Sequence, residues 1–155
     1  MPWHGKGNLL PHEPPPPFFV LDNGLNPHIA RAMASLGYRI RSVQDEFEDP
    51  TGAVEDPDII NHISRTYGFH GVWITKDTSA KRAHLELIKA RRISVVWVQK
   101  QALSTQQQHR IIAFGFARVH QDLLESKHPI HYLVTFHGCE NRERITYRVE
   151  WAPHK

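Results

Sequence analysis

Cysteine and long apolar runs are nearly absent from this chain, and each absence excludes a class of protein. A single cysteine, Cys139, rules out an intramolecular disulfide and a zinc site built from several cysteines. No apolar run comes near the ~18 residues that a membrane-spanning helix needs, and the run at 18–21 is too short for a secretory signal. No glycine-rich phosphate-binding loop precedes a predicted helix. We therefore expect a soluble, cytoplasmic protein.

The composition predicts one folded domain. A length of 155 residues is usual for a single core, and 40% hydrophobic residues with 10% aromatic residues are enough to build it. The formal net charge of +3 permits a nucleic-acid partner without requiring one.

The charges are unevenly distributed along the chain. Residues 44–58 contain seven acids and no lysine or arginine, whereas residues 76–100 contain seven basic residues and two acids. The near-neutral total therefore hides an acidic segment and a basic segment.

Proline content divides the chain into a tail and a domain. Residues 1–17 hold six of the eleven prolines and no periodic apolar pattern, so we predict a disordered tail. Residues 18–155 are predicted to form a single domain, with a core at 18–100 and an extension at 101–155.

The core reads as alternating strands and helices. We predict strands at 18–21, 38–43, 72–75 and 93–98, because these segments are short apolar or alternating runs. The second of them alternates polar and apolar residues, as a strand near a sheet edge does. Asn26-Pro27 and Asp56-Pro57 predict two helix starts, and a third helix is expected from Thr78 or Ser79 to Arg92. This order is typical of a parallel α/β sheet.

The extension has a different pattern. Residues 103–125 predict one long helix, because Ile112, Phe116, Val119 and Leu123 share a helical face. Two alternating segments, at 130–136 and 145–151, flank a polar turn and predict a β-hairpin. The pattern leaves open whether the hairpin joins the main sheet.

Carboxylates follow the predicted strands of the core. Asp22 ends the first strand, Asp45 follows the second, Asp56 heads the next helix, and Asp77 follows the third strand. Ligands of open parallel sheets bind beyond the carboxyl ends of the strands. Carboxylates gathered there repel one another, and a bound Mg²⁺ or Mn²⁺ ion offsets that repulsion while also binding phosphate oxygens. The alternatives are that Asp56 only caps its helix and that the acids after Val43 form a solvated loop.

The segment 18–99 resembles the compact PIN-like domains, a group that includes the VapC-type toxin ribonucleases. The resemblance rests on Phe-Phe-Val-Leu-Asp-Asn at 18–23, on an Asp-headed helix, and on Trp-Ile-Thr-Lys-Asp at 73–77. It implies a three-layer α/β/α fold and an acidic pocket that holds one or two Mg²⁺ or Mn²⁺ ions. It also implies hydrolysis of RNA to products that carry a 5′-phosphate.

Matched position by position, the resemblance makes Asp22, Asp45, Asp56 and Asp77 the catalytic and metal-binding residues, with Asp58 as an alternative to Asp56. The basic residues Lys76, Lys81 and Arg82, with Arg91 and Arg92, would hold the RNA backbone without reading its sequence. By the same resemblance, we expect an antitoxin protein and a second copy of the chain as partners.

Three other functions are less well supported by the sequence. A PIN-like domain could bind nucleic acid or protein without cutting it. A receiver-type phosphoacceptor domain also gathers aspartates at strand ends, but its lysine would follow a later strand, whereas Lys76 directly precedes Asp77. A zinc site of His128, His131, His137 and Cys139 has a spacing that matches no standard module.

Overall fold

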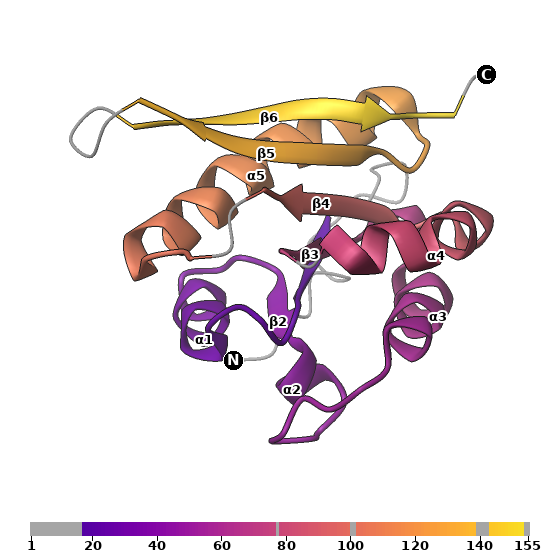
Figure 1. Ribbon diagram of the computed structural model, residues 1–155, viewed down its shortest axis with the longest axis horizontal. Helices are drawn as coiled ribbons and strands as arrows, with labels where there is room; N and C mark the ends of the chain where they lie inside the picture. Colours follow the sequence, from indigo (N-terminus) through magenta and orange to yellow (C-terminus); the bar gives the residue numbers. More distant parts are fainter. Residues whose placement is uncertain (1–16, 77, 100–101, 139–142, 154–155) are drawn as a thin grey trace.

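Strands and helices alternate along the chain, as Figure 1 shows for the computed structural model. The structure describes residues 17–76, 78–99, 102–138 and 143–153. In chain order, the elements are β1 (Phe18–Leu21), α1 (Pro27–Ser35), β2 (Ile40–Ser42), α2 (Val43–Glu46), α3 (Asp56–Tyr67), the 3-10 turn η2 (Gly68–His70), β3 (Gly71–Thr75), α4 (Thr78–Arg91), β4 (Ser94–Val98), α5 (Thr105–Ser126), β5 (His131–His137) and β6 (Arg144–Trp151).

The strands form one six-stranded sheet in the order β2-β1-β3-β4-β5-β6. The first five pair in parallel, and β6 pairs antiparallel with β5. The α/β class is therefore confirmed, and β2 lies at an edge, as its alternating sequence predicted. The structure also answers the question that the sequence left open, because β5 pairs with β4 and so joins the extension to the main sheet. The turn predicted between β5 and β6 falls partly on 139–142, outside the described residues.

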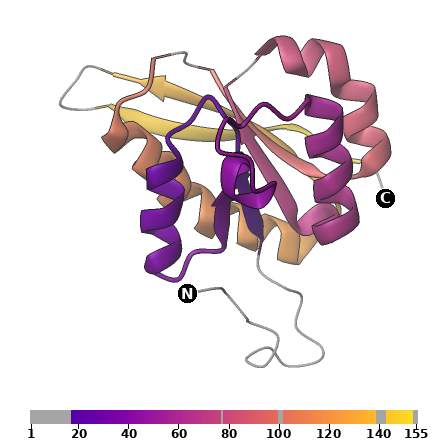
Figure 2. The ribbon, with the colours of Figure 1, turned by 90° about the horizontal axis from the view of Figure 1, so that it is seen from below.

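Helices cover both sides of the sheet, in an arrangement compatible with three α/β/α layers. Phe19 and Leu21 of β1 face the side where α1 and α5 pack, whereas Val20 faces α3 and α4. The same alternation continues in β3, where Trp73 faces α3 and α4. In Figure 2, α1 lies to the left of the strands and α3 and α4 lie to the right. Since successive strand residues point to opposite sides, a strand that is covered on both sides must be largely apolar throughout.

Helix starts follow the predicted cap signals with one correction. Asn26 precedes α1, and its side chain accepts a hydrogen bond from the His28 backbone amide, with Pro27 in the first turn. The prediction that Asp56 caps α3 is wrong, because Asp56 is the first helical residue and Glu55 holds the cap position without a side-chain bond. The Glu55 carbonyl already accepts the first helical hydrogen bond, from the Ile59 amide.

The second strand is shorter than predicted. It ends at Ser42, whose hydroxyl accepts a hydrogen bond from the Asp45 amide and so starts the one-turn helix α2. Val43 and Asp45 therefore belong to a helix and not to a strand or its exit. A serine that bonds the backbone three residues ahead favours a helical turn over a continued strand.

The ends of the chain lie mostly outside the described region. Residues 1–16 of the predicted tail are not among the described residues, and Pro17, its last residue, is buried. No described helix combines the length and the apolar character needed to cross a membrane.

Candidate functional site

Asp22 stands at the carboxyl edge of the sheet, directly after β1. Its backbone amide donates to the Ile74 carbonyl of the neighbouring strand β3 over 2.9 Å. The hydroxyl of Thr75, the fully buried last residue of β3, donates to Asp22 Oδ2 over 2.6 Å. The Asn23 amide donates to Asp22 Oδ1 over 2.9 Å. Two strands and a turn thus fix the orientation of this carboxylate.

A cavity of about 700 Å³ opens beside Asp22. Asp56, from the first turn of α3, lines the same cavity, and its Oδ2 atom lies 3.8 Å from Nε2 of His84 on α4. Lys76, which follows β3, also lines it. Carboxylates from two separate elements therefore face one space together with two basic side chains.

At two glycines that line this cavity, the backbone lies so close to a neighbouring side chain that a Cβ atom would not fit without a shift. Gly52 has a φ of +67°, and a Cβ atom there would overlap the amide oxygen of Asn23. Gln44 Nε2 donates to the same Asn23 oxygen over 3.1 Å. At Gly24, a Cβ would lie 2.9 Å from Cε of Lys76. Asn23 lies in the turn after β1, and its side-chain oxygen connects that turn to Gln44 of α2.

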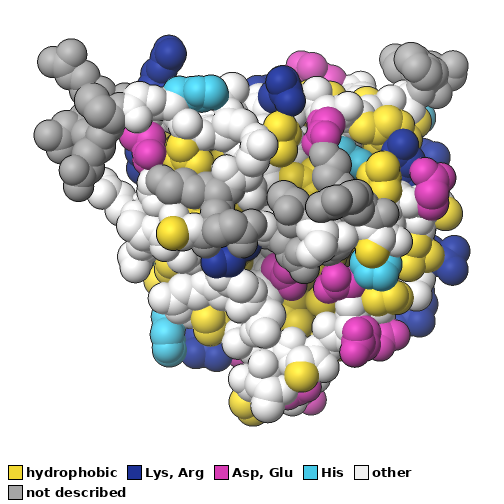
Figure 3. Space-filling model, in the orientation of Figure 1, with side chains coloured by type: hydrophobic (Ala, Val, Ile, Leu, Met, Phe, Trp, Pro, Cys, Tyr) yellow, Lys and Arg dark blue, Asp and Glu magenta, His cyan; other side chains and the backbone are white. Residues whose placement is uncertain are grey.

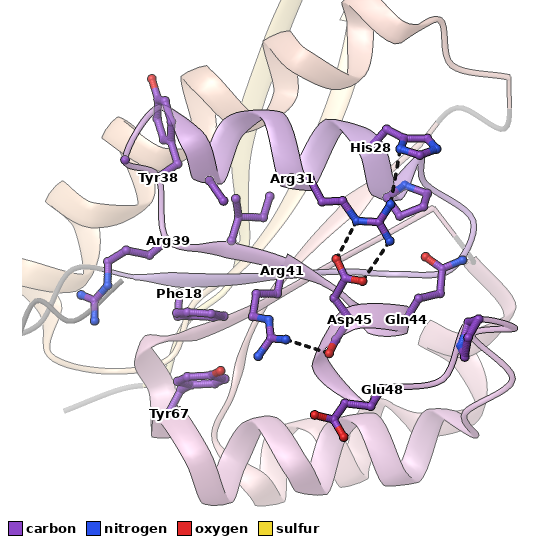
Figure 4. A pocket seen from close by; sticks show the side chains of 15 residues that line it. Phe18, His28, Arg31, Tyr38, Arg39, Arg41, Gln44, Asp45, Glu48 and Tyr67 are labelled. Carbon is purple, nitrogen blue, oxygen red and sulfur yellow. Dashed lines mark hydrogen bonds and ion pairs between the residues drawn. The ribbon is translucent and has the colours of Figure 1, made fainter. Parts of the chain in front are cut away.

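Asp45 lines a different cavity, of about 1050 Å³, between α1 and the edge strand β2 (Figure 4). Arg31 of α1 holds its carboxylate with two hydrogen bonds of 2.9 Å, from Nε and Nη2. Arg41 donates to the Asp45 backbone carbonyl over 2.8 Å. The hydrogen bond from Arg31 holds the pKa of the Asp45 carboxyl below its usual value.

Glu46, the next acid, is turned into the protein. Its side chain is only 4% exposed, and Oε2 accepts hydrogen bonds from the Tyr67 hydroxyl at 2.6 Å and from His62 Nε2 at 2.8 Å. Arg41 Nη1 lies 3.3 Å from Oε1. Burial, followed by this hydrogen bond, raises the pKa of Tyr67 well above its ordinary value. This network was not predicted, because its donors are 16 and 21 residues away along the chain.

The remaining predicted residues have varied positions. Asp77 lies outside the described residues, as do the side chains of Lys81 and Arg82 on α4. Asp58 is exposed and does not line the cavity of Asp22. Among the arginines at the end of α4, Arg91 donates to Asn61 and Arg92 is exposed. The structure therefore brings Asp22, Asp56 and Lys76 together and places Asp45 apart from them.

The described residues contain no cluster of three or more histidine, cysteine, aspartate or glutamate side chains that is suited to a metal ion. Asp77 and Cys139 are not among the described residues. His131 and His137 lie on one side of β5, but His131 is buried, with its ring centre 4.5 Å from that of Trp151, and His137 is exposed.

Comparisons with protein-family models, with curated proteins and with solved structures find no match for this chain. Function must therefore be inferred from the residues themselves.

Proposed function

We propose that this chain is a PIN-like endoribonuclease that depends on Mg²⁺ or Mn²⁺, with its hydrolytic site in the cavity of Asp22 and Asp56. The observation that carries the proposal is the convergence of these two carboxylates with Lys76 and His84 at the carboxyl edge of a parallel sheet. Ligands of such sheets bind at this edge.

The side chains around the cavity suit a hard divalent cation. Asp22 and Asp56 present carboxylate oxygens, the ligands that Mg²⁺ and Mn²⁺ prefer. Asp77, one residue beyond Lys76, completes the proposed set. A bound cation would act as a Lewis acid that activates water and offsets the negative charge of the phosphate.

Each neighbouring side chain has a distinct part in the proposed reaction. The Thr75 hydroxyl keeps Asp22 oriented through its 2.6 Å hydrogen bond. Lys76 and His84 would attract the phosphate, with Lys81 and Arg82 extending the positive rim. Hydrolysis joins the water oxygen to phosphorus and breaks the bond from phosphorus to O3′. The O3′ atom takes up a proton, and the products carry a 5′-phosphate and a 3′-hydroxyl.

The decisive experiment compares cleavage of 5′-labelled single-stranded RNA by Asp22→Asn, Asp56→Asn and the unchanged chain, with Mn²⁺ and with EDTA. We expect both variants to lose on the order of 100-fold or more in rate, because a missing ligand costs more than the 10–100-fold typical of outer-shell changes. Asp58→Asn is the matched control, since Asp58 lies in the same turn of α3 but is exposed.

Circular dichroism checks that each variant is folded. Cleavage by Asp22→Asn at the rate of the unchanged chain would remove this cavity from consideration. Loss of activity in Asp58→Asn but not in Asp56→Asn would mean that Asp58, and not Asp56, is the metal ligand on α3.

A second candidate function is a PIN-like module that binds nucleic acid or protein without cutting it. The observation that favours it is the bidentate pair between Arg31 and Asp45, which holds the third predicted ligand in another cavity. A chain that binds RNA, shows no Mn²⁺ binding by calorimetry and does not cleave RNA would have this function.

We also propose that the nuclease has the protein partners of a toxin, namely an antitoxin and a second copy of the chain. Helix α5 exposes two apolar side chains that a partner would cover, since Phe114 is 58% exposed and Leu124 is 39% exposed.

A further inference from the structure

The last two strands have one covered side and one open side. On the α5 side, Tyr132 and Val134 of β5 and Tyr147 of β6 are buried in the core. On the other side, α3 and α4 pack on the central strands, where Val20, Trp73 and Trp97 are buried. Beyond them, the outward side chains of β6 remain exposed, and in Figure 1 the β5–β6 pair extends past α4.

The pairing register shows which residues share the open side. Leu133 pairs with Arg148, Thr135 with Thr146, and His137 with Arg144. We call these six residues the open face. Arg144, Thr146, Arg148 and His137 are exposed, whereas Leu133 and Thr135 are half-buried. Arg144 and Arg148 are four residues apart on one strand, so their Cα atoms are separated by about 13 Å.

The two arginines of the open face differ from most of the other arginines whose side chains the structure describes. Arg31 pairs with Asp45, Arg110 with Glu143, and Arg118 with Asp122. By contrast, Arg144 and Arg148 form no ion pair or side-chain hydrogen bond with any residue that the structure describes. Their guanidinium groups, which donate in a planar fork suited to phosphate, are therefore available to a ligand.

The positive charge continues beyond the open face. Lys89, at the end of α4, places its Nζ atom 5.1 Å from the centre of the Trp151 ring, next to the last residues of β6. Glu150 is the only acid in β6, and β5 has none. In Figure 3, lysine and arginine side chains lie along the upper rim of the molecule, where β6 runs, with aspartate and glutamate side chains between them. The six residues of the open face themselves include no acid.

We propose that the open face binds the sugar-phosphate backbone of single-stranded RNA and docks the substrate of the nuclease. This inference rests on the proposed function. Because β1, β3, β4 and β5 are parallel, His137 lies at the same edge of the sheet as Asp22. Three strand spacings, or about 14 Å, separate their strands. The open face would therefore hold nucleotides several positions away from the scissile phosphate.

The contacts would be made without reading the base sequence. Guanidinium groups and threonine hydroxyls bind phosphate and sugar oxygens, which are the same in every nucleotide. A short substrate that fills only the cavity of Asp22 would not reach the open face. RNA length, and not RNA sequence, should then decide how much this surface contributes.

The test measures RNA binding separately from cleavage. Fluorescence anisotropy with a labelled 20-nucleotide single-stranded RNA, in EDTA, compares the full chain with the double variant Arg144→Glu/Arg148→Glu. We expect at least tenfold weaker binding. The slope of log K against log salt should fall by about 1.4, since each phosphate contact on a single strand contributes about 0.7.

The matched control is Arg65→Glu/Lys127→Glu, which makes the same change in net charge at two exposed positions away from the open face. We expect this control to bind nearly as tightly as the unchanged chain. Equal losses in the two double variants, or no loss in Arg144→Glu/Arg148→Glu, would overturn the proposal. Melting curves confirm that both variants are folded.

A cleavage assay separates this inference from the proposed function. If the proposed function and this inference are both correct, Arg144→Glu/Arg148→Glu raises KM for long RNA without lowering kcat, and it cleaves a trinucleotide at the normal rate. If the chain does not cleave RNA at all, the proposed function fails, while a selective loss of RNA binding still supports the open face as an RNA-binding surface.

Discussion

The acids between Gln44 and Asp58 meet different partners in the folded chain. Asp45 pairs with Arg31, and Glu46 accepts hydrogen bonds from His62 and Tyr67. Asp49 accepts bonds from the amide and hydroxyl of Thr51, in the turn before α3. Much of the repulsion that the sequence implied is therefore relieved within the protein, and of these acids Glu55 and Asp56 line the cavity of Asp22.

Residue identity predicted the surroundings of Asp22 better than those of Asp45. Asp22 was recognisable because a carboxylate that ends a buried strand needs partners, and Thr75 and Asn23 supply them. The partner of Asp45 could not be predicted, because Arg31 reaches it only once α1 packs beside α2. Pairing across separate helices has no local pattern in a sequence.

The pair between Arg31 and Asp45 should make stability depend on acid pH. The hydrogen bond from Arg31 lowers the folded-state pKa of Asp45 below its unfolded value of about 3.9. The stabilisation is therefore complete above that unfolded pKa, and it is lost as the pH falls through the lower folded-state pKa. We expect Arg31→Gln to reduce the melting temperature slightly at pH 7 and not at pH 2, because exposed ion pairs contribute little.

The control for this measurement is Arg65→Gln, which removes an exposed arginine at the end of α3. Its effect should not vary with pH. A loss in Arg31→Gln that stays constant from pH 7 to pH 2 would show that the Asp45 carboxylate is not the source of the effect.

Whole elements were predicted well where periodicity was strong. The continuous apolar strands β1, β3 and β4 are buried on both sides, and α5 presents Ile112, Val119 and Leu123 to the core as its spacing predicted. The boundary of β2 was wrong because the Ser42 hydroxyl starts a helix where apolar alternation alone suggested more strand. Local hydrogen bonding by one side chain decided that boundary.

A close contact between α5 and β6 depends on the absence of one side chain. Gly115 faces the Tyr147 ring, and a Cβ atom there would overlap the tyrosine hydroxyl and lie 2.8 Å from Cζ. That hydroxyl donates to the Ile111 carbonyl, one turn earlier in α5. Glycine is a poor helix former, so its presence in the middle of a helix is explained here by the tyrosine that approaches it.

We expect Gly115→Ala to lower the free energy of unfolding by about 1–3 kcal/mol, because overpacking at a buried ring outweighs the better helix propensity of alanine. Urea unfolding measures the change. In the Tyr147→Phe background the loss should shrink, since the atom that the new Cβ overlaps first is gone. Equal losses in both backgrounds would mean that the hydroxyl contact is not responsible.

The extension completes the molecule instead of forming an appendage. Helix α5 contributes to the same core as β1, where the Phe116 and Phe19 rings lie 4.5 Å apart, and β5 pairs with β4. The sequence predicted a helix and two paired strands but not this placement, because the pairing of β5 with β4 joins residues separated by a 22-residue helix. Such long-range pairing has no signal in local periodicity.

Removing the extension should therefore unfold the core. A chain that ends at Gln99 would lose the four buried apolar side chains of α5, namely Ile111, Ile112, Val119 and Leu123, and would leave β4 as an unpaired edge. We expect no cooperative thermal transition by circular dichroism, and partial recovery of helical signal when residues 100–155 are added as a separate fragment. A shortened chain that melts cooperatively at the temperature of the full chain would refute this expectation.

The position of β1 in the sheet has a consequence during synthesis. Phe19 and Leu21 leave the ribosome early, yet their cover, α5, is completed only at Ser126, and the last strand ends at Trp151. At a translation rate of about 5–20 residues per second, the 53 residues between Val98 and Trp151 take roughly 3–10 s to make. For that time the nascent chain carries four strands whose apolar side lacks the cover of α5, and we expect ribosome-associated chaperones to bind it.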